Sequence, residues 1–163
     1  MEKTELRELL RRRLSHVSVA DVAAASVTIA ERLMREIDWQ RVSRACLYQP
    51  AVKWREIDLY TLMEWLQEYH SSIDITILPQ MKNAIIPDES FDVILVPLLG
   101  YDSSCSRLGR GSGWYDRFLA GQPQTIKIGV ALEVQQLDFV PVELHDIRLD
   151  KVISEQATYL RRD

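Results

Sequence analysis

The chain has 163 residues, of which 47% are hydrophobic and 27% are charged, and its formal net charge is −4. This composition suits one globular domain over residues 1–163 and argues against general binding to nucleic acid, which usually needs a basic surface. No stretch approaches the roughly 18 apolar residues of a membrane-spanning helix. The two cysteines, Cys46 and Cys105, lack metal-binding spacing, so we expect free thiols in a cytoplasmic protein.

The first third of the chain shows two helical patterns. Apolar residues recur at helical spacing over residues 6–14 and again over 19–37. Ser18 has the chemistry of an N-cap for the second helix, and Asp21 adds a favourable negative charge in its first turn. The arginine run 11–13 lies on the first helix, and we interpret it as a solvated face.

The rest of the chain alternates between strand and helix patterns. Short apolar runs predict strands over residues 45–48, 73–78, 91–99, 126–131 and 152–154. Between them, Asp58 is the expected N-cap of one helix, and residues 114–120 form another. This alternation predicts a three-layer α/β/α domain with a largely parallel central sheet.

Two of these strands carry a prediction about burial. In 73–78 the isoleucines occupy alternate positions, which predicts one buried face. The run 91–99 is the most apolar of all and predicts a central strand buried on both faces, with Pro97 near its end. In parallel α/β folds, ligands bind beyond the carboxyl ends of the strands. The segment 100–113 leaves the central strand at that edge, so we expect a ligand site there.

A glycine-rich segment, RLGRGSGWYD, occupies residues 107–116. Alternating glycines allow the backbone to approach a ligand, and successive N–H groups together with a helix N-terminus attract anions. Arg107 and Arg110 add guanidinium groups that match phosphate geometry. The segment is neither a Walker A loop nor the dinucleotide fingerprint. Composition alone leaves open a phosphate site or a flexible turn.

Asp116 lies three residues after Gly113, in the first turn of the expected helix. A carboxylate beside a polyphosphate loop can hold Mg²⁺, which favours one or two carboxylates plus phosphate oxygens. The alternative is an ordinary acidic residue at a helix start, stabilised by the helix dipole. The residue pattern alone does not separate these two interpretations.

The central segment DVILVPLLGYDSSCSRLGRGSGWYDRFL resembles the main motif of the 5-formyltetrahydrofolate cyclo-ligase family, R-L-G-x-G-x-G-Y-Y-D-R-[FY]-L with a preceding P-x-x-x-[FY]-D element. The matching positions are Asp92, Pro97, Tyr101, Asp102, Arg107, Leu108, Gly109, Gly111, Gly113, Tyr115, Asp116, Arg117 and Leu119. The segments KTELR, LYQPAVKWREIDL, IGVALEVQ and VPVELHDIRLDKVISE resemble further family elements, in order along almost the whole chain.

The resemblance implies an enzyme that converts 5-formyltetrahydrofolate to 5,10-methenyltetrahydrofolate while ATP becomes ADP and phosphate, with ATP and Mg²⁺ as cofactors. The implied catalytic residues are Arg107, Arg110 and Asp116. The implied nucleotide contacts are Lys3, Arg7, Arg107, Leu108, Gly109, Arg110, Gly111, Ser112, Gly113, Trp114 and Tyr115. The implied folate contacts are Glu56, Arg110, Trp114 and Tyr115, and the implied metal ligands are Asp116 and Asp146. The expected partner is the small molecule 5-formyltetrahydrofolate, and we expect neither nucleic acid nor a membrane as a partner. The protein is expected to be a monomer or weak dimer.

Three positions depart from the family pattern. Trp114 replaces the first tyrosine of the Y-Y-D triplet, Ser112 stands where glycine or lysine is common, and the stretch 79–91 is short. Two alternatives therefore stay open. One is a low-activity relative that binds a nucleotide or folate, and the other is an ATP-dependent enzyme for another N-formyl or amide substrate.

Overall fold

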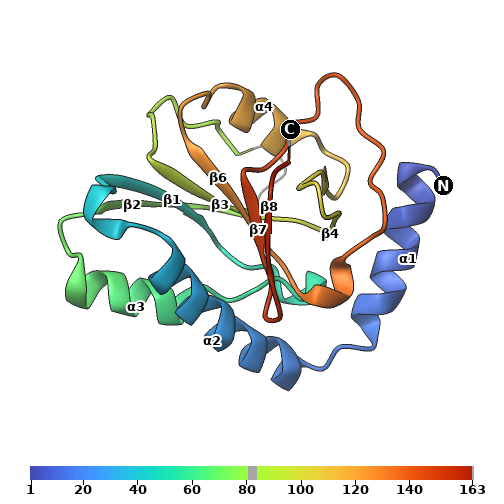
Figure 1. Cartoon of the computed structure of the whole chain (residues 1–163), viewed down its shortest axis with the longest axis horizontal. Helices are drawn as coiled ribbons and strands as arrows, with labels where there is room; N and C mark the ends of the chain where they lie inside the picture. The colour runs from blue at the N-terminus through green and yellow to red at the C-terminus, as the bar shows by residue number, and fades with distance from the viewer. Residues whose placement is uncertain (81–83, 163) are drawn as a thin grey trace.

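A computed structural model describes residues 1–80 and 84–162 of the chain; within the short stretch 79–91, residues 81–83 thus lie outside the description. The main strands are β1 (Arg44–Tyr48), β2 (Asp74–Leu78), β3 (Val93–Pro97), β6 (Ile126–Val130), β7 (Lys151–Ile153) and β8 (Thr158–Leu160). They form one sheet in the order β2-β1-β3-β6-β7-β8, in which every neighbouring pair is parallel except β7–β8 (Figure 1). The predicted α/β class with a largely parallel sheet is confirmed.

Helices cover both faces of this sheet. The α-helices are α1 (Lys3–Ser15), α2 (Val19–Glu36), α3 (Tyr60–Tyr69) and α4 (Trp114–Ala120), and the 3-10 helices are η1 (Trp39–Arg41), η2 (Val52–Trp54) and η3 (Glu133–Gln135). In Figure 1, α2 and α3 run along one side of the sheet and α4 lies on the other. The same view places α1 at the end of the molecule, beyond the carboxyl end of β3.

The central strand β3 shows how the sheet separates two hydrophobic cores. Successive side chains of a strand point to opposite faces. Val93 and Leu95 accordingly join the core under α1, α2 and α3, whereas Ile94 and Val96 join the core under α4. All five residues of β3 are buried, which confirms the prediction of a strand covered on both faces. The expectation of free thiols is also confirmed, since both cysteines are free and buried.

The predicted starts of α2, α3 and α4 agree with the structure to within one residue, whereas α1 begins at Lys3, before the first apolar residue of its pattern. Ser18 is the N-cap of α2, and its side chain accepts a hydrogen bond from the Asp21 amide at 3.0 Å, as expected. The prediction for α3 is wrong by one position, because Leu59 is its cap residue. Asp58 lies one residue before this cap, and its carboxylate accepts a hydrogen bond from the Tyr60 amide at 2.7 Å.

The burial prediction for β2 is wrong at one position. Ile73 is 8% exposed, but Ile77 is 45% exposed. The cause is the position of β2 at the edge of the sheet, where it has a neighbour on one side only. A further difference lies between β3 and α4, where β4 (Gly100–Tyr101) and β5 (Arg107–Leu108) form a small antiparallel hairpin instead of a plain loop.

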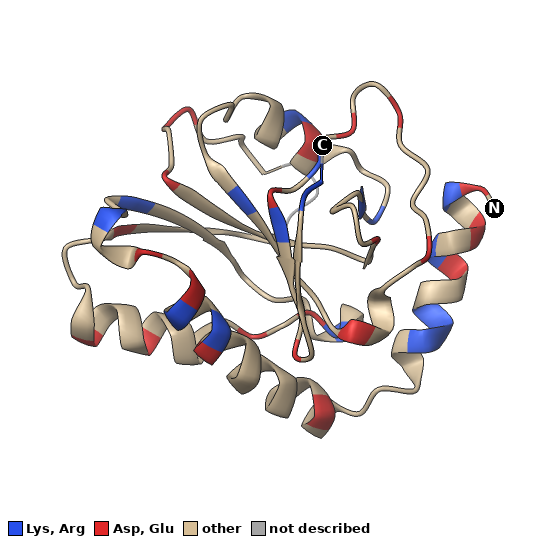
Figure 2. Cartoon of the chain, in the orientation of Figure 1, with Lys and Arg blue, Asp and Glu red and all other residues tan. Residues whose placement is uncertain are grey.

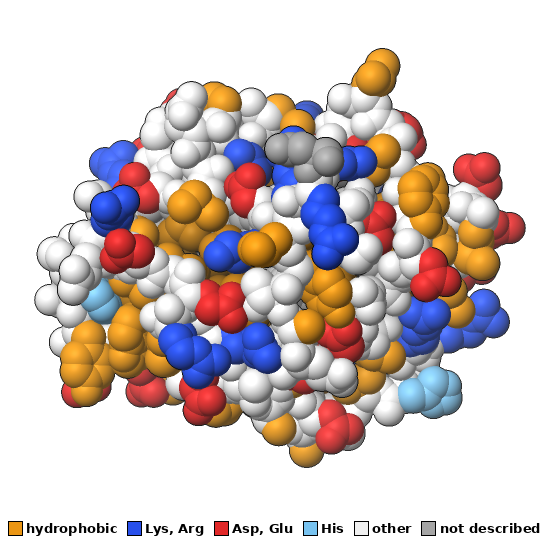
Figure 3. Space-filling view, in the orientation of Figure 1, with side chains coloured by type: hydrophobic (Ala, Val, Ile, Leu, Met, Phe, Trp, Pro, Cys, Tyr) orange, Lys and Arg blue, Asp and Glu red, His pale blue; other side chains and the backbone are white. Residues whose placement is uncertain are grey.

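The charged residues are spread over the elements. Figure 2 shows basic and acidic residues interspersed along α1 and α2, and on the face shown in Figure 3 blue and red side chains lie next to one another. Within residues 1–80 and 84–162, none of the helices combines the length and the apolar character that crossing a bilayer requires.

Candidate functional site

A cleft of about 1190 Å³ opens where the sheet meets α1 and the start of α4. Tyr48, Leu78 and Pro97, at the carboxyl ends of β1, β2 and β3, line its floor. This edge of the sheet is where a parallel α/β fold is expected to bind its ligand. The cleft also brings together every residue that the sequence predicted for the site, namely Lys3, Arg7, Glu56, residues 107–116 and Asp146.

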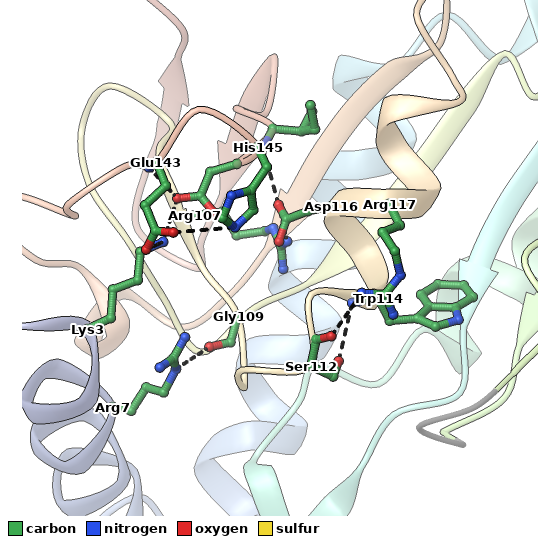
Figure 4. A network of polar contacts seen from close by, with 12 residues as sticks. Lys3, Arg7, Arg107, Gly109, Ser112, Trp114, Asp116, Arg117, Glu143 and His145 are labelled. Atoms are coloured by element: carbon green, nitrogen blue, oxygen red, sulfur yellow. Dashed lines mark hydrogen bonds and ion pairs between the residues drawn. The ribbon is translucent and has the colours of Figure 1, made fainter.

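The glycine-rich loop forms one wall of this cleft and adopts backbone angles that only glycine takes readily. Gly111 has φ +113° and Gly113, the N-cap of α4, has φ +66°. The loop lies against α1, because Arg7 donates from Nε to the carbonyl oxygen of Gly109 at 2.9 Å (Figure 4). Ser112 Oγ accepts the Trp114 amide at 3.3 Å, which fixes the start of the helix.

Arg107 and Asp116 form a nearly buried ion pair behind the loop. Arg107 Nη2 donates to Asp116 Oδ1 at 2.9 Å, and the two side chains are 4% and 16% exposed. The same Oδ1 accepts the Ile147 amide at 3.2 Å, so Asp116 also ties α4 to the chain before β7. Arg107 Nε is buried and has no hydrogen-bond partner within the described residues. Buried donors are nearly always satisfied, so an unpaired one in a cleft wall fits an incoming anionic oxygen.

Arg110 and Glu56 form a second ion pair, between Arg110 Nη2 and Glu56 Oε1. Glu56 is 5% exposed, and its other oxygen accepts the Ala51 amide at 2.7 Å. Burial lowers the pKa of Arg110, yet a guanidinium stays charged at any physiological pH. The residue expected on phosphate and the residue expected on the folate therefore neutralise each other in the free protein.

Lys3 and Asp146 form a third pair, at the other end of the cleft. Lys3 Nζ donates to Asp146 Oδ2 at 2.6 Å and lies 3.0 Å from Glu143 Oε1 (Figure 4). Burial acts to lower the pKa of Lys3, but its bonds to the two carboxylates prevail and the pKa is raised. Burial likewise acts to raise the pKa of Asp146, but the hydrogen bonds from Lys3 and the Glu143 amide prevail and the pKa is lowered. Both groups are thus held in their charged forms.

The two expected metal ligands lie close to one another. Asp116 accepts a hydrogen bond from the amide of Ile147, the residue that follows Asp146. In the part of the chain that the structure describes, no group of three or more His, Cys, Asp or Glu side chains could hold a metal ion. Mg²⁺ commonly keeps only one or two carboxylates and completes its shell with phosphate oxygens and water. The residues present therefore fit Mg²⁺ that arrives with a nucleotide better than a resident metal.

Three other predicted residues are placed mainly by packing. Trp114 is 8% exposed, its ring centroid lies 5.3 Å from that of Phe118, and its Nε1 donates to the Ala84 carbonyl at 2.8 Å. In Figure 4 its indole points away from Lys3 and Arg7. Tyr115 is partly buried, and burial raises the pKa of its hydroxyl. The Leu108 side chain is 1% exposed in the core, so only its backbone can face a ligand.

Trp54 is not among the residues predicted for the site from the sequence, yet it lines the cleft. The guanidinium of Arg11 lies 5.3 Å from its ring centroid. The interpretation of 11–13 as a solvated face is therefore incomplete, because Arg13 donates to the Gln136 carbonyl at 2.9 Å. Within the described residues, Arg12 is exposed and its side chain makes no such contact. The helical spacing from Lys3 and Arg7 to position 11 was a signal that could have placed this third cation on the cleft.

Comparison with known proteins identifies relatives along the whole chain. Residues 77–155 match the model of the 5-formyltetrahydrofolate cyclo-ligase family. A probable 5-formyltetrahydrofolate cyclo-ligase of Schizosaccharomyces pombe is 23% identical, and the alignment covers 96% of each chain. A 5-formyltetrahydrofolate cyclo-ligase of Mycoplasma pneumoniae is 36% identical over a shorter alignment, which covers 53% of this chain and 52% of that protein.

Solved structures extend the match to the complete fold. A 5,10-methenyltetrahydrofolate synthetase from Mycoplasma pneumoniae superposes with a TM-score of 0.79 at 25% identity and covers 95% of this chain and 99% of that one. The NMR structure of an Aquifex aeolicus 5,10-methenyltetrahydrofolate synthetase has the same fold, with a TM-score of 0.80 at 23% identity, over 100% of this chain and 94% of that one. The family motif, these relatives and the shared fold agree: residues 77–155 match the 5-formyltetrahydrofolate cyclo-ligase family, and the whole chain has the fold of the 5,10-methenyltetrahydrofolate synthetases.

Proposed function

We propose that this protein converts 5-formyltetrahydrofolate to 5,10-methenyltetrahydrofolate, with ATP going to ADP and phosphate. The observation that carries the proposal is the meeting of separate chain segments in one cleft. Lys3 and Arg7 come from α1, Glu56 from the segment after η2, residues 107–116 from the glycine-rich loop and Asp146 from the chain before β7. These are the positions at which the sequence resembles the family.

The chemistry of the reaction explains the excess of arginine in the loop. A formamide oxygen is a poor leaving group until the γ-phosphoryl group of ATP is transferred to it. The neighbouring N10 then attacks the activated carbon, and the oxygen departs as phosphate. Phosphoryl transfer needs positioning and charge neutralisation more than covalent help. Arg107, with a buried and unpaired Nε, together with Arg110 and the amides of the loop, would supply both.

At the nucleotide end, Lys3 and Arg7 would contact ATP from α1, and the loop backbone with Ser112 would contact its phosphates. Asp116 and Asp146 would hold the Mg²⁺ that accompanies the nucleotide. When bound, Mg²⁺ neutralises phosphate charge and orients the phosphoryl group. Because Lys3 and Arg107 already neutralise these two carboxylates, binding of the metal requires that the ion pairs loosen or share their oxygens.

At the folate end, Glu56 would accept hydrogen bonds from the N–H groups of the pterin, and the aromatic ring of Tyr115 would flank it. Arg110 and Glu56 pair with each other in the free protein, so a ligand of either residue competes with this contact. Trp114 would contribute mainly as a packed wall, since only 8% of its surface is exposed. This arrangement keeps the phosphate groups and the pterin at neighbouring positions in the cleft.

The same proposal covers the protein as a whole. We propose one domain over residues 1–163, acting as a monomer or weak dimer in the cytoplasm on a small molecule, without nucleic acid or membrane as a partner. Support comes from the net charge of −4, the two free thiols and the mixed surface charge. Analytical ultracentrifugation of the purified chain would test the oligomeric state.

A direct assay tests the function. The protein is mixed with 5-formyltetrahydrofolate, MgCl₂ and ATP, and formation of the methenyl product is followed by its near-ultraviolet absorbance. We expect a rise that requires ATP and releases one phosphate per product. Folate or nucleotide binding without turnover would favour the low-activity relative. ATP hydrolysis that responds to another formamide, but not to the folate, would favour the alternative substrate.

A further inference from the structure

The chain makes a left-handed turn directly before Glu56, the proposed ligand of the pterin. Arg55 has φ 55° and ψ 33°, which lies in the left-handed αL region. Among the residues that the structure describes, only Arg55 and Cys105 adopt a positive φ without being glycine. Glycine takes such angles without steric cost, whereas a residue with a Cβ atom is disfavoured there. An arginine at this position therefore indicates that its side chain offsets the strain by a contact of its own.

The side chain of Arg55 joins this turn to the connection between α1 and α2. Its Nε donates to the carbonyl oxygen of Val17 at 2.9 Å, and its Nη1 donates to that of Val52 at 3.5 Å. Val17 follows the C-cap of α1 and precedes Ser18, the N-cap of α2. Arg55 is not among the residues that line the cleft. It can therefore act on a ligand only through a neighbouring residue.

Glu56 is held in place on both sides of its backbone. One carboxylate oxygen accepts a hydrogen bond from the Ala51 amide at 2.7 Å, and the other pairs with Arg110. After Glu56, Ile57 is 1% exposed, and its carbonyl oxygen accepts a hydrogen bond from the Tyr48 hydroxyl at 2.8 Å. The left-handed turn lies between these fixed points, so it sets the direction in which the carboxylate leaves the backbone.

We propose that Arg55 is a positioning residue for Glu56. The turn directs the Glu56 carboxylate into the cleft, and the hydrogen bond from Arg55 Nε to Val17 stabilises the turn against relaxation to ordinary backbone angles. The ligand contacts Glu56, and Arg55 acts only through it. This inference rests on the proposed function, because it takes the pterin as the ligand of Glu56.

Two substitutions separate the Nε hydrogen bond from the charge of Arg55. R55Q places an amide nitrogen at the position of Nε and keeps a donor for Val17, whereas R55M places a methyl group there. Both variants remove the guanidinium, and both side chains are unbranched and of similar length. The matched control is R12M, because Arg12 is exposed and does not line the cleft. If R55M does not fold, R55A removes the same hydrogen bond and takes its place.

Steady-state kinetics locate the effect of the hydrogen bond. For R55M we expect KM for 5-formyltetrahydrofolate to rise roughly threefold to tenfold, the range that one hydrogen bond is worth. R55Q and R12M should keep the wild-type value, and KM for ATP should be unchanged in all three variants. A lower thermal stability of R55M with both KM values unchanged, or an equal rise of both, would give Arg55 a general structural role and overturn the inference. Equal rises in R55Q and R55M would overturn it too, because the charge would then be responsible.

A double-mutant cycle shows whether Arg55 acts through Glu56. R55M and E56Q are made singly and together, and the dissociation constant for 5-formyltetrahydrofolate is measured by isothermal titration, which needs no turnover. Residues that act through one another are not additive. R55M should therefore weaken folate binding in the wild-type background and have little further effect in E56Q. Equal weakening in both backgrounds would mean that Arg55 acts independently of Glu56, and the inference would be wrong.

The same titrations separate the inference from the proposed function. If the wild type binds the folate but forms no product, the proposed function fails, while the cycle still decides the role of Arg55. If the wild type forms product and R55M binds the folate as tightly as R55Q does, the proposed function stands and the inference is wrong. A wild type that does not bind the folate would refute both.

Discussion

Arg110 and Glu56 pair across the cleft, joining the glycine-rich loop to the segment that follows η2. We propose phosphate as the ligand of the first residue and the pterin as the ligand of the second. In the free protein the two side chains therefore pair with each other instead of with a ligand. A ligand that draws one of them away releases the other. Such coupling is reciprocal, because each ligand changes the affinity for the other by the same factor. ATP is accordingly expected to tighten folate binding.

The substitution Glu56→Gln distinguishes the proposed pterin contact of Glu56 from the proposed phosphate contact of Arg110. E56Q removes the charge that accepts the pterin N–H groups and also releases Arg110. We expect KM for the folate to rise at least about tenfold, since hydrogen bonds to a charged group are worth roughly 1.5–3 kcal/mol. KM for ATP should stay the same or fall. The control is E31Q, which removes an exposed acid from α2 and should change neither value. A rise of KM for ATP alone would assign Glu56 to the nucleotide.

Asp116 is expected to serve both metal binding and structure. D116N keeps an oxygen acceptor for the Ile147 amide but leaves Arg107 without its counter-charge. Removing one partner of a buried ion pair typically costs about 3–5 kcal/mol, and the loss of charge stabilisation in phosphoryl transfer should lower kcat at least about 100-fold. Thermal unfolding and turnover at saturating Mg²⁺ check the two effects, with D138N as an exposed control. Normal turnover by a destabilised D116N would leave the residue a structural role only.

The fold could be predicted where a buried face requires apolar residues at regular spacing in the sequence. The capping serine Ser18, the helix that follows it and the fully apolar β3 were all predicted, because each buries a regular pattern. The hairpin of β4 and β5 and the strand β8 have only two or three residues each, which is too short to show a period. The exposure of Ile77 depends on which strand lies at the edge, and no local pattern contains that information.

The residues predicted for the site lie in one cleft, but the contacts between them could not be predicted from the sequence. A family motif names residues, and the parallel sheet predicts that they meet at its carboxyl edge. Which charge pairs with which depends on the folded geometry, as with Arg110 and Glu56. The same reason explains why Trp54 was missed, since its three cations come from α1, η2 and the glycine-rich loop.

The pair formed by Lys3 and Asp146 predicts a dependence of stability on pH. Asp146 has a pKa lowered from its ordinary 3.8, so its contribution is present above that value and is lost as the pH falls through the lowered pKa. Lys3 has a pKa raised from 10.5, so its contribution is present below that value and is lost as the pH rises through the raised pKa. Between these two pKa values the side chains of Asp146 and Lys3 are both charged.

Replacing Lys3 by methionine should therefore lower the free energy of unfolding by a constant amount at neutral pH. The difference between wild type and K3M should decline as the pH falls below 3.8. Denaturant unfolding of the wild type and K3M, from neutral pH to below pH 3.8, measures this difference in the free energy of unfolding. R41Q, which breaks the exposed pair of Arg41 with Asp38, should show almost no difference at any pH. A difference for K3M that is independent of pH would mean that the lysine acts through packing of its chain alone.

Trp114 and Trp54 should respond in opposite ways to substitution, although both line the cleft. Trp114 is nearly buried, packs on Phe118 and donates to the Ala84 carbonyl, so the family-like change W114Y removes core volume and this hydrogen bond. We expect a loss of about 1–3 kcal/mol in stability, with KM for the folate changed less than about threefold. W54A should instead raise KM for the folate with little loss of stability, because its ring is partly exposed. Thermal unfolding and KM measured side by side would distinguish them, and a W114Y protein that is as stable as the wild type but binds folate differently would place the indole in the ligand site.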